Sequence, residues 1–280
     1  MILLDYSQIA LSNIIVQKLN DESMIRHMIL NSIRMYNLKY RDEYGQMVIC
    51  ADGMNTWRKE YYPEYKAHRK KNRDNSDQDW TEIFRILHLV REEIQENLPY
   101  KVLHMEGCEA DDIIGALVFE AQEFGKDEPI MIVSSDKDFI QLQKFKNVKQ
   151  FSPIQKKAVT DKHPRTYLFN HICRGDAGDG IPNVLSPDNC FTESLRQTPL
   201  RQNVIDTWLE NESIMPEEVK RNFQRNKTLI DLNEIPDRIY NSIVQKYESQ
   251  KPAMKMKVLN YLIKKRCNNL IESVEEFYNG

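Results

Sequence analysis

The chain has 280 residues, of which 41% are hydrophobic and 29% are charged, and its formal net charge is −3. Such an apolar content supplies a buried core and excludes a disordered chain over most of the length. The length suits one large domain, or one domain with a helical appendage. No apolar run approaches the roughly 18 residues that a membrane span requires. Asp5 interrupts the first apolar run, which argues against a secretory leader.

Cysteine and histidine spacing indicates neither a disulfide framework nor a zinc site. The five cysteines are odd in number, scattered and without a C-x-x-C pair, which favours a reducing compartment. The histidines also form no ligand pattern, and we predict structural roles for all six of them: His27, His68, His88, His104, His163 and His171. We therefore expect a soluble protein of the cytoplasm.

Strand-like and helix-like stretches alternate through the first half of the chain. Apolar runs typical of buried strands cover residues 1–4, 47–51, 101–105, 130–133 and 148–151. Between them, helical periodicity places Ile25, Ile29 and Ile33 on one face, and Ile83 and Leu87 on another. Asp79 is a plausible N-cap for the second helix. This alternation predicts an α/β fold with a central, mostly parallel sheet flanked by helices on both faces.

The pattern changes near residue 164, where the strand signal ends. Residues 239–247 and 254–265 read as packed helices. We therefore predict an α/β domain over residues 1–164 and a helical region over residues 165–280.

Nine acidic residues recur where the apolar runs end or beside a glycine-rich turn: Asp5, Asp52, Glu109, Asp111, Asp112, Asp136, Asp138, Asp176 and Asp179. If the runs are parallel strands, their carboxyl ends open on one crevice, the usual ligand site of an open α/β sheet. So many carboxylates need cations beside them, because like charges raise one another's pKa and repel. Hard oxygen ligands in this number point to magnesium or manganese. The sequence thus predicts a metal-dependent enzyme.

Each acidic group also has an ordinary explanation. Glu109, Asp111 and Asp112 would open a helix, where the macrodipole alone favours acidic side chains. The D-x-D pair of Asp136 and Asp138 also occurs in capped helices, and single acids such as Asp5 are common at strand ends. The metal interpretation depends on their shared position at one end of successive strands, and on three carboxylates within four residues.

The segment RGDAGDGIPNV, residues 174–184, predicts a hairpin. Its glycines at 175, 178 and 180 permit positive φ and close approach by a phosphate. Helices around residues 167–173 and from residue 188 onward would make it a helix–turn–helix element that grips a duplex backbone. A simple surface turn is the alternative.

Aromatic and basic residues are interleaved between Trp57 and Arg73, where seven basic residues face only two acidic ones. Aromatic faces can stack on unpaired bases while Lys and Arg neutralise phosphates. A solvated amphipathic helix is the alternative. Because the segment directly follows Asp52, we expect it to overhang the site. A basic segment beside an acidic crevice is the arrangement that a metal-dependent nuclease needs.

Together, LLDYSQIALS, the segment 57–69, CEADD, IVSSDKDFIQL, NVKQFSPIQKK and GDAGD resemble, in order and spacing, the structure-specific 5′-nuclease, or flap endonuclease, superfamily. Among its members the chain is most similar to the T-even phage type. The resemblance runs almost end to end. It implies a catalytic domain over residues 1–164 with a helical arch at about 53–75, and a duplex-binding region over 165–280 with a helix–three-turn–helix element.

The resemblance also implies roles for single residues. A first metal ion would be held by Asp5, Asp52, Glu109, Asp111, Asp112 and Asp136, and a second by Asp138, Asp176 and Asp179. Arg58 and Lys66 would contact the scissile phosphate, and Trp57, Tyr65, Arg69, Lys70, Gly178 and Gly180 would contact the nucleic acid. The expected cofactors are two Mg²⁺ ions, with Mn²⁺ as the alternative, about 4 Å apart as in other two-metal sites.

The implied activity is 5′-to-3′ exonuclease and flap endonuclease cleavage of RNA/DNA and DNA duplexes, which removes RNA primers in lagging-strand replication. The implied substrates are branched or nicked duplex DNA and RNA/DNA hybrid. The implied partners are a single-stranded-DNA-binding protein and a sliding clamp, bound by a monomer in the host cytoplasm. Residues 274–278 resemble part of a clamp-binding peptide, although a packed helix end explains them better. Two rival functions are a PIN-like ribonuclease that cuts single-stranded RNA and a non-catalytic module that binds branched DNA.

Overall fold

The structure, a computed structural model, describes residues 1–17, 21–69, 73, 75–76 and 78–278. Its centre is a six-stranded sheet in the order β3-β2-β1-β4-β5-β6. The strands are β1 (Ile2–Asp5), β2 (Met47–Ala51), β3 (Lys101–His104), β4 (Ile130–Val133), β5 (Val148–Ser152) and β6 (Lys157–Val159). All neighbouring pairs are parallel except β5 with β6. The predicted mostly parallel sheet is confirmed, and each of the five predicted strands lies within one residue of its expected bounds.

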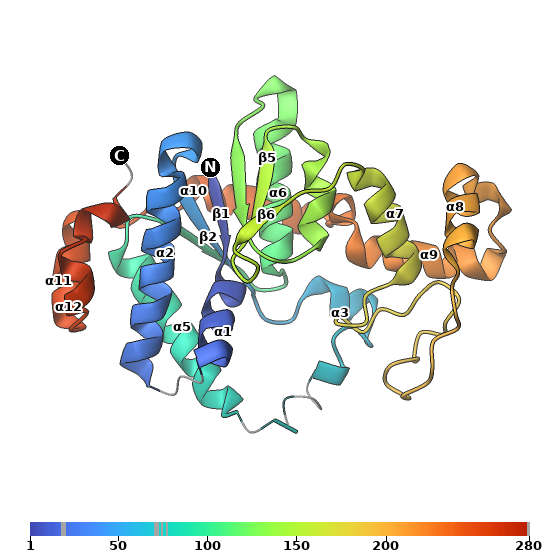
Figure 1. Ribbon diagram of the computed structural model, residues 1–280, viewed down its shortest axis with the longest axis horizontal. Helices are drawn as coiled ribbons and strands as arrows, with labels where there is room; N and C mark the ends of the chain where they lie inside the picture. Colours follow the sequence, from blue (N-terminus) through green and yellow to red (C-terminus); the bar gives the residue numbers. More distant parts are fainter. Residues whose placement is uncertain (18–20, 70–72, 74, 77, 279–280) are drawn as a thin grey trace.

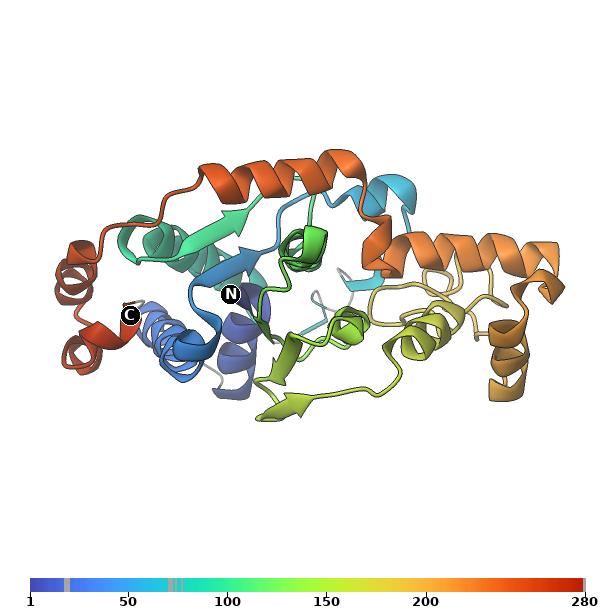
Figure 2. The same cartoon turned by 90° about the horizontal axis from the view of Figure 1, so that it is seen from above.

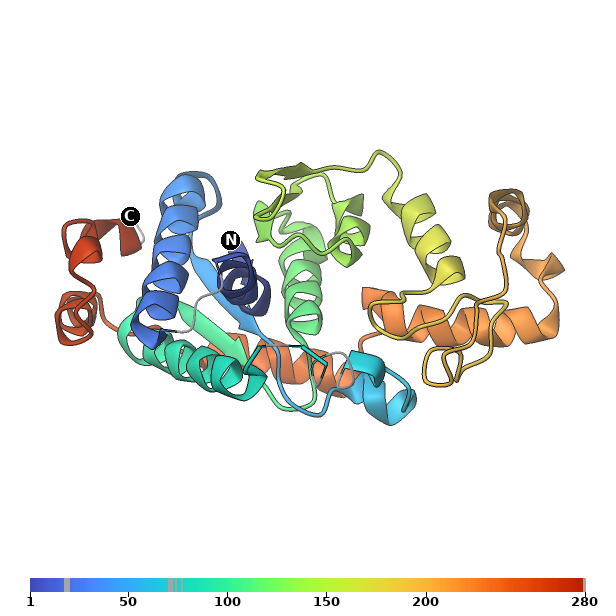
Figure 3. The same ribbon diagram turned by 60° about the horizontal axis from the view of Figure 1, so that its bottom comes forward.

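Helices cover both faces of the sheet because its strands are apolar on both sides (Figure 1; Figure 3). Ile2 and Leu4 of β1 belong to one core cluster and Leu3 to the other, as the alternation of side chains along a strand requires. The first core is closed by α1 (Tyr6–Gln17), α2 (Glu22–Tyr44) and α5 (Trp80–Asn97), and the second by α6 (Ala110–Gln122) and α10 (Asp237–Ser249).

Local signals fix where these helices begin. The Asp79 side chain accepts a hydrogen bond from the Glu82 amide at 3.0 Å, so the predicted N-cap of α5 is confirmed. Gly53, which follows β2, donates its amide to the Cys108 carbonyl at 2.9 Å. A Cβ at this position would lie 1.6 Å from the Met105 carbonyl oxygen, so only glycine allows the chain to pass here towards α3 (Trp57–Tyr61).

The second half of the chain divides between the sheet and a separate small core, which Figure 2 shows at one end of an elongated molecule. The small core lies among α7 (Pro164–Arg174), α8 (Gln202–Glu210) and α9 (Glu217–Ile230). The later elements return to the sheet: α10, α11 (Met256–Lys264), α12 (Asn268–Ile271) and η5 (Val274–Phe277). Residues beyond 231 therefore share the cores of the first half, and the division at residue 164 stays a prediction.

The remaining elements are short 3₁₀ turns: η1 (Glu123–Gly125), η2 (Asp138–Lys144), η3 (Glu212–Ile214) and η4 (Leu232–Glu234). The helix predicted from residue 188 onward is wrong. Asp188 instead lies in a turn, where its carboxylate forms ion pairs with Arg221 and Arg225 of α9. Phe277 is fully buried, which fits a packed helix end at the C-terminal tail. Among the described residues, no helix is long and apolar enough to cross a bilayer.

Candidate metal centre

The sheet topology brings several predicted carboxylates to the carboxyl end of the parallel strands. The connections from β1 run to β2 on one side and those from β4 to β5 on the other, so β1 and β4 flank the point where strand order reverses. Ligand sites of open α/β sheets lie at the carboxyl ends of such strands. Asp5 ends β1, Asp52 follows β2, and Asp136 lies in the loop after β4. Asp111 joins them from the first turn of α6.

Asp5 lies deepest in this group and is only 7% exposed. Its carboxylate accepts hydrogen bonds from the Gln8 amide at 3.1 Å and from the Ser134 hydroxyl at 3.0 Å. Burial, with the charge of Asp52 beside it, raises the pKa of Asp5 to about 7. The fold therefore holds Asp5 where ionisation is costly unless a cation is bound nearby.

Asp111 and Asp136 have the same difficulty. Burial, and then the neighbouring charge of Asp136, raises the pKa of Asp111 well above its ordinary value. Burial and the charge of Asp138 raise the pKa of Asp136 to about 6. Among the described residues, no Lys or Arg forms an ion pair with Asp5, Asp111 or Asp136. We call these three the cation-free carboxylates.

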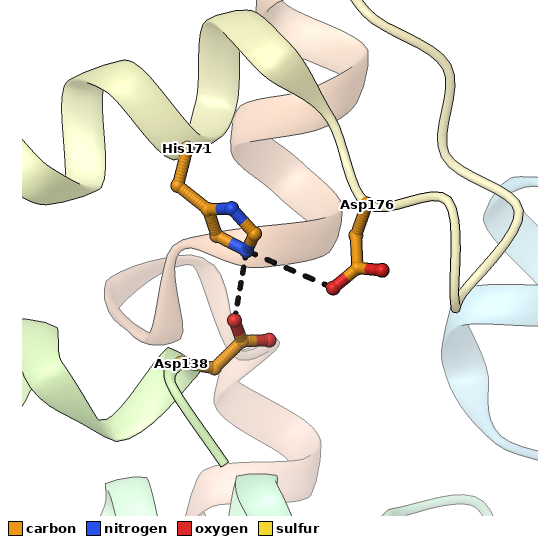
Figure 4. A group of neighbouring side chains, drawn as sticks. All are labelled: Asp138, His171 and Asp176. Carbon is orange, nitrogen blue, oxygen red and sulfur yellow. Dashed lines mark hydrogen bonds and ion pairs between the residues drawn. The ribbon is translucent and has the colours of Figure 1, made fainter.

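A second cluster lies beside them, where Asp138, His171 and Asp176 point towards one another (Figure 4). The Nε2 atom of His171 lies 2.8 Å from Asp138 Oδ1 and 3.8 Å from Asp176 Oδ2. Burial alone would lower the pKa of His171, but the bond to Asp138 and the nearby negative charges outweigh it and raise that pKa. Burial, with Asp179 and Asp138 nearby, raises the pKa of Asp176.

Three of the other predicted ligands, Glu109, Asp112 and Asp179, are already neutralised by side chains of the segment after Asp52. Glu109 lies 2.6 Å from Lys66 Nζ and 3.2 Å from Arg58 Nη1, and Asp179 pairs with Lys66 and Arg69. Burial opposes ionisation of Glu109, but Lys66 and Arg58 outweigh it and lower its pKa. The pKa of Asp179 is lowered in the same way, by Lys66 and Arg69 against burial. With Asp112, these are the neutralised carboxylates.

Asp112 departs most clearly from its predicted role as a metal ligand. It is 0% exposed. Its oxygens contact the Arg58 guanidinium at 2.8–2.9 Å, the Trp57 indole nitrogen at 3.2 Å and the Glu109 amide at 2.8 Å. The last contact completes a capping box at the start of α6. Both oxygens thus have partners within the protein, which favours a structural role, and the predicted role of Asp112 as a metal ligand stays a prediction.

Three residues that were predicted to contact nucleic acid are also buried. Arg58 is 3% exposed, and its Nε donates to the Leu229 carbonyl at 2.9 Å. Trp57 faces Asp112, and the Tyr65 hydroxyl lies 2.8 Å from Glu109 and 2.9 Å from Asp179. All three side chains are engaged within the protein, and their predicted contacts with a phosphate or a base stay a prediction. In the structure, they hold the neutralised carboxylates in place.

The predicted hairpin packs against the segment that was predicted to form the arch. The Lys66 amide donates to the Asp179 carbonyl at 2.7 Å, and Arg69 Nε donates to the Gly178 carbonyl at 3.0 Å. A Cβ at Gly180, where φ is +75°, would lie 3.1 Å from the Glu64 carbonyl oxygen. Here the glycine allows contact between two parts of the chain. The predicted role of Lys70 falls outside the described residues.

The positions of Asp52 and His171 can also be compared with the roles predicted from the sequence. Asp52 is exposed, and its Oδ1 accepts a hydrogen bond from the Ala110 amide at 2.9 Å, so it also caps α6. His171 was predicted to be merely structural, yet it lies among the carboxylates. The sequence held one signal for this position. His171 stands five residues before Asp176, so the helix that leads into the hairpin can bring both side chains to the same site.

Two family models match the chain. The 5′–3′ exonuclease, N-terminal resolvase-like domain matches residues 9–166, and the T4 RNase H, C-terminal model matches residues 164–277. Ribonuclease H of Enterobacteria phage T4 is 35% identical over 292 residues, which cover 98% of this chain and 95% of the phage protein. A 5′–3′ exonuclease of Buchnera aphidicola is 29% identical over 154 residues, covering 52% of this chain and 50% of that protein.

Among solved structures, the flap endonuclease of bacteriophage T5, in a pseudo-enzyme–product complex with DNA and metal ions, is similar with a TM-score of 0.63. The match covers 89% of this chain and 99% of the other at 18% identity. At that identity the likeness establishes a shared fold.

Proposed function

The chain belongs to the 5′–3′ exonuclease family that includes ribonuclease H of phage T4, and from this membership we propose that it is a divalent-metal-dependent 5′-nuclease. The resemblance seen in its motifs is thereby confirmed. Its substrates in this proposal are RNA/DNA and DNA duplexes with a nick or a 5′ branch. The reaction is hydrolysis of a phosphodiester, with removal of RNA primers during lagging-strand replication as the biological task.

The observation that carries the proposal is the group of cation-free carboxylates at the carboxyl ends of β1 and β4 and the start of α6. One buried and two half-buried carboxylates beside one another are costly without a counter-charge. Oxygen donors of this kind suit Mg²⁺ or Mn²⁺. The spacing of the Asp138, His171 and Asp176 donor atoms, all within 4.8 Å of one another, suits a second ion.

In the mechanism we propose, Asp5, Asp111 and Asp136 hold one divalent cation, and Asp138 and Asp176 hold another. Bound there, two Mg²⁺ ions, or Mn²⁺ as the alternative, would lower the pKa of the attacking water and stabilise the leaving oxygen. Ser134 and Gln8 orient Asp5 by the hydrogen bonds described above. No covalent intermediate on a side chain is needed.

Lys66 is the side chain best placed to act on the phosphate. Its Nζ lies between Glu109 and Asp179, 2.6 and 3.4 Å away, and its side chain is partly exposed. We propose that it offsets charge that builds on the phosphoryl oxygens. Arg58, which is buried against Asp112 and Glu109, holds those carboxylates and positions Lys66 through Glu109.

The helical region supplies the second half of the proposal. We assign duplex binding to residues 165–231, including the hairpin that contacts Lys66 and Arg69. Of the predicted duplex-binding region over residues 165–280, the proposal keeps residues 165–231 for this role, because residues beyond 231 pack into the cores of the first half, the predicted catalytic domain over residues 1–164. A single-stranded-DNA-binding protein and a sliding clamp are proposed partners on the strength of the family resemblance.

A 5′-flap duplex labelled at each end in turn tests this function. With Mg²⁺, the protein should release short products from the flap strand, and without Mg²⁺ it should release none. Single-stranded RNA of the same sequence should be cut far more slowly. Rapid cleavage of that RNA would favour the PIN-like ribonuclease, and tight binding to the flap with no cleavage under any metal would favour the non-catalytic module.

A further inference from the structure

One side chain in the metal centre is of a different chemical type from the rest. His171 comes from the last turn of α7, where its ring stacks on Tyr167 with centroids 6.0 Å apart. This contact and the helix direct Nε2 towards Asp138 and Asp176 (Figure 4). The side chain is 17% exposed, so it is fixed in place and still open to the crevice.

The spacing of the three donor atoms matches what a metal ion requires. Ligands about 2.1 Å from an ion lie about 3 Å apart when adjacent and about 4.2 Å apart when opposite in an octahedral site. Nε2 lies 2.8 Å from Asp138 Oδ1 and 3.8 Å from Asp176 Oδ2, and all three atoms lie within 4.8 Å of one another. Little movement would bring the three to one ion.

We propose that His171 is a nitrogen ligand of the cation held by Asp138 and Asp176, and that it makes this position favour Mn²⁺ over Mg²⁺. The inference rests on the proposed function, because it concerns the same site. Mg²⁺ prefers oxygen ligands and dehydrates reluctantly. Imidazole suits first-row transition metals better than Mg²⁺, and Mn²⁺ combines a preference for carboxylates with a place in the series of first-row ions that sites with nitrogen donors bind.

The competing role for His171 is that of a hydrogen-bond partner that only orients Asp138. The two roles differ in their response to a change from nitrogen to oxygen. In His171→Gln the side-chain amide can still donate a hydrogen bond to Asp138, and its oxygen can still bind a hard cation. A purely orienting role therefore predicts an unchanged metal preference, whereas nitrogen ligation predicts a changed one.

Pulsed electron paramagnetic resonance of bound Mn²⁺ tests ligation directly, because a ligating imidazole nitrogen modulates the echo of the ion. The full chain is loaded with Mn²⁺ alone, beside His171→Gln and a control, His163→Gln, which makes the same change at the exposed start of α7. Nitrogen modulation should be present in the wild type and His163→Gln and absent from His171→Gln. Its absence from the wild type, or its survival in His171→Gln, would overturn the proposal.

Calorimetric titration with Mn²⁺ and with Mg²⁺ supplies the second readout. In His171→Gln, we expect Mn²⁺ affinity at one site to fall at least about tenfold while Mg²⁺ affinity changes less, since loss even of an outer-shell partner of a metal typically costs 10–100-fold. An equal change for both ions would contradict the proposal. A wild type that binds no divalent ion and cuts no flap would instead refute the proposed function. Binding and cleavage without nitrogen modulation would refute only the role of His171.

Discussion

Among the nine predicted carboxylates, two groups differ in whether basic side chains of the protein supply their positive counter-charge. Glu109, Asp112 and Asp179 are neutralised by Arg58, Lys66 and Arg69, which all come from the segment after Asp52. The cation-free carboxylates, Asp5, Asp111 and Asp136, have no Lys or Arg partner among the described residues, and burial raises the pKa of each. Acidic residues in one crevice can therefore have different roles. Some pair with basic side chains of the protein, and in the mechanism proposed above others bind an ion.

The largest expected effect on stability comes from a substitution at Asp112, one of the neutralised carboxylates. The change Asp112→Asn leaves the buried Arg58 with Glu109 as its one remaining carboxylate partner. Breaking a buried ion pair from one side costs roughly 3–5 kcal/mol. Urea unfolding of the metal-free protein should show this loss, with Asp42→Asn, at a 94% exposed side chain, as the control. A loss below 1 kcal/mol would mean that Asp112 is not a structural carboxylate.

Asp5 should behave in the opposite way. Its folded pKa, about 7, lies above the ordinary value, so the folded state binds more protons and loses stability as pH rises towards and through 7. Raising the pKa of Asp5 from 3.8 to about 7 lowers the free energy of unfolding by up to about 4 kcal/mol, and this penalty is complete only above pH 7. Asp5→Asn removes that penalty.

Thermal melts in a chelator at pH 5.5 and pH 8 measure this effect. Asp5→Asn should melt higher than the wild type at pH 8 and higher by a smaller margin at pH 5.5, where roughly half of the penalty is already present because the unfolded carboxyl is ionised. Burial lowers the pKa of His88 and His104, whose stability contribution follows pH in the opposite direction, but both proteins share them and the difference cancels. A lower melting temperature for Asp5→Asn at pH 8 would contradict the assignment of Asp5 to the cation-free group.

Flap cleavage tests the role of the cation-free carboxylates. Asp136→Asn should lower flap cleavage by roughly 100-fold or more, because loss even of an outer-shell partner of a metal costs 10–100-fold. Flap binding in Ca²⁺ should be retained, since Asp136 is not in the proposed duplex-binding region. The same gel assay on Asp42→Asn should match the wild type. Unchanged cleavage by Asp136→Asn would remove this carboxylate from the site.

The smallest effect concerns the contact that links the two regions. Gly180→Ala places a side chain at positive φ, which costs about 1 kcal/mol, and presses it against the Glu64 carbonyl. We expect a loss of about 1–2 kcal/mol by urea unfolding. Gly45→Ala, at a glycine where φ is +76° and a Cβ would meet nothing within 4 Å, is the control and should lose only the backbone part, about 1 kcal/mol. Equal effects would show that the hairpin does not depend on this contact.

Much of the fold was predictable because its strands are short, apolar and bounded by acidic residues. Asp79 could be identified as an N-cap from local sequence alone, and the prediction is confirmed. β6 was missed because it is an edge strand of three residues with two exposed positions, so it carries no apolar pattern. The helix expected after residue 188 failed because long-range ion pairs to α9 hold Asp188 in a turn.

The site was less predictable, because residue type does not reveal which carboxylates the protein neutralises. Arg58 meets Asp112 across 54 residues of sequence, and no local pattern distinguishes Asp112 from Asp111 beside it. His171 approaches Asp138 from 33 residues away and was missed for the same reason. The strand ends could indicate where the carboxylates gather, but their partners depend on packing between α3, α6 and α7.

The most direct measurement is an anomalous difference map from a crystal soaked in Mn²⁺. One peak should lie among Asp5, Asp111 and Asp136, and a second beside Asp138 and Asp176. A peak enclosed by Asp112, Arg58 and Glu109, or no peak beside the cation-free carboxylates, would contradict the division on which the proposed nuclease mechanism depends.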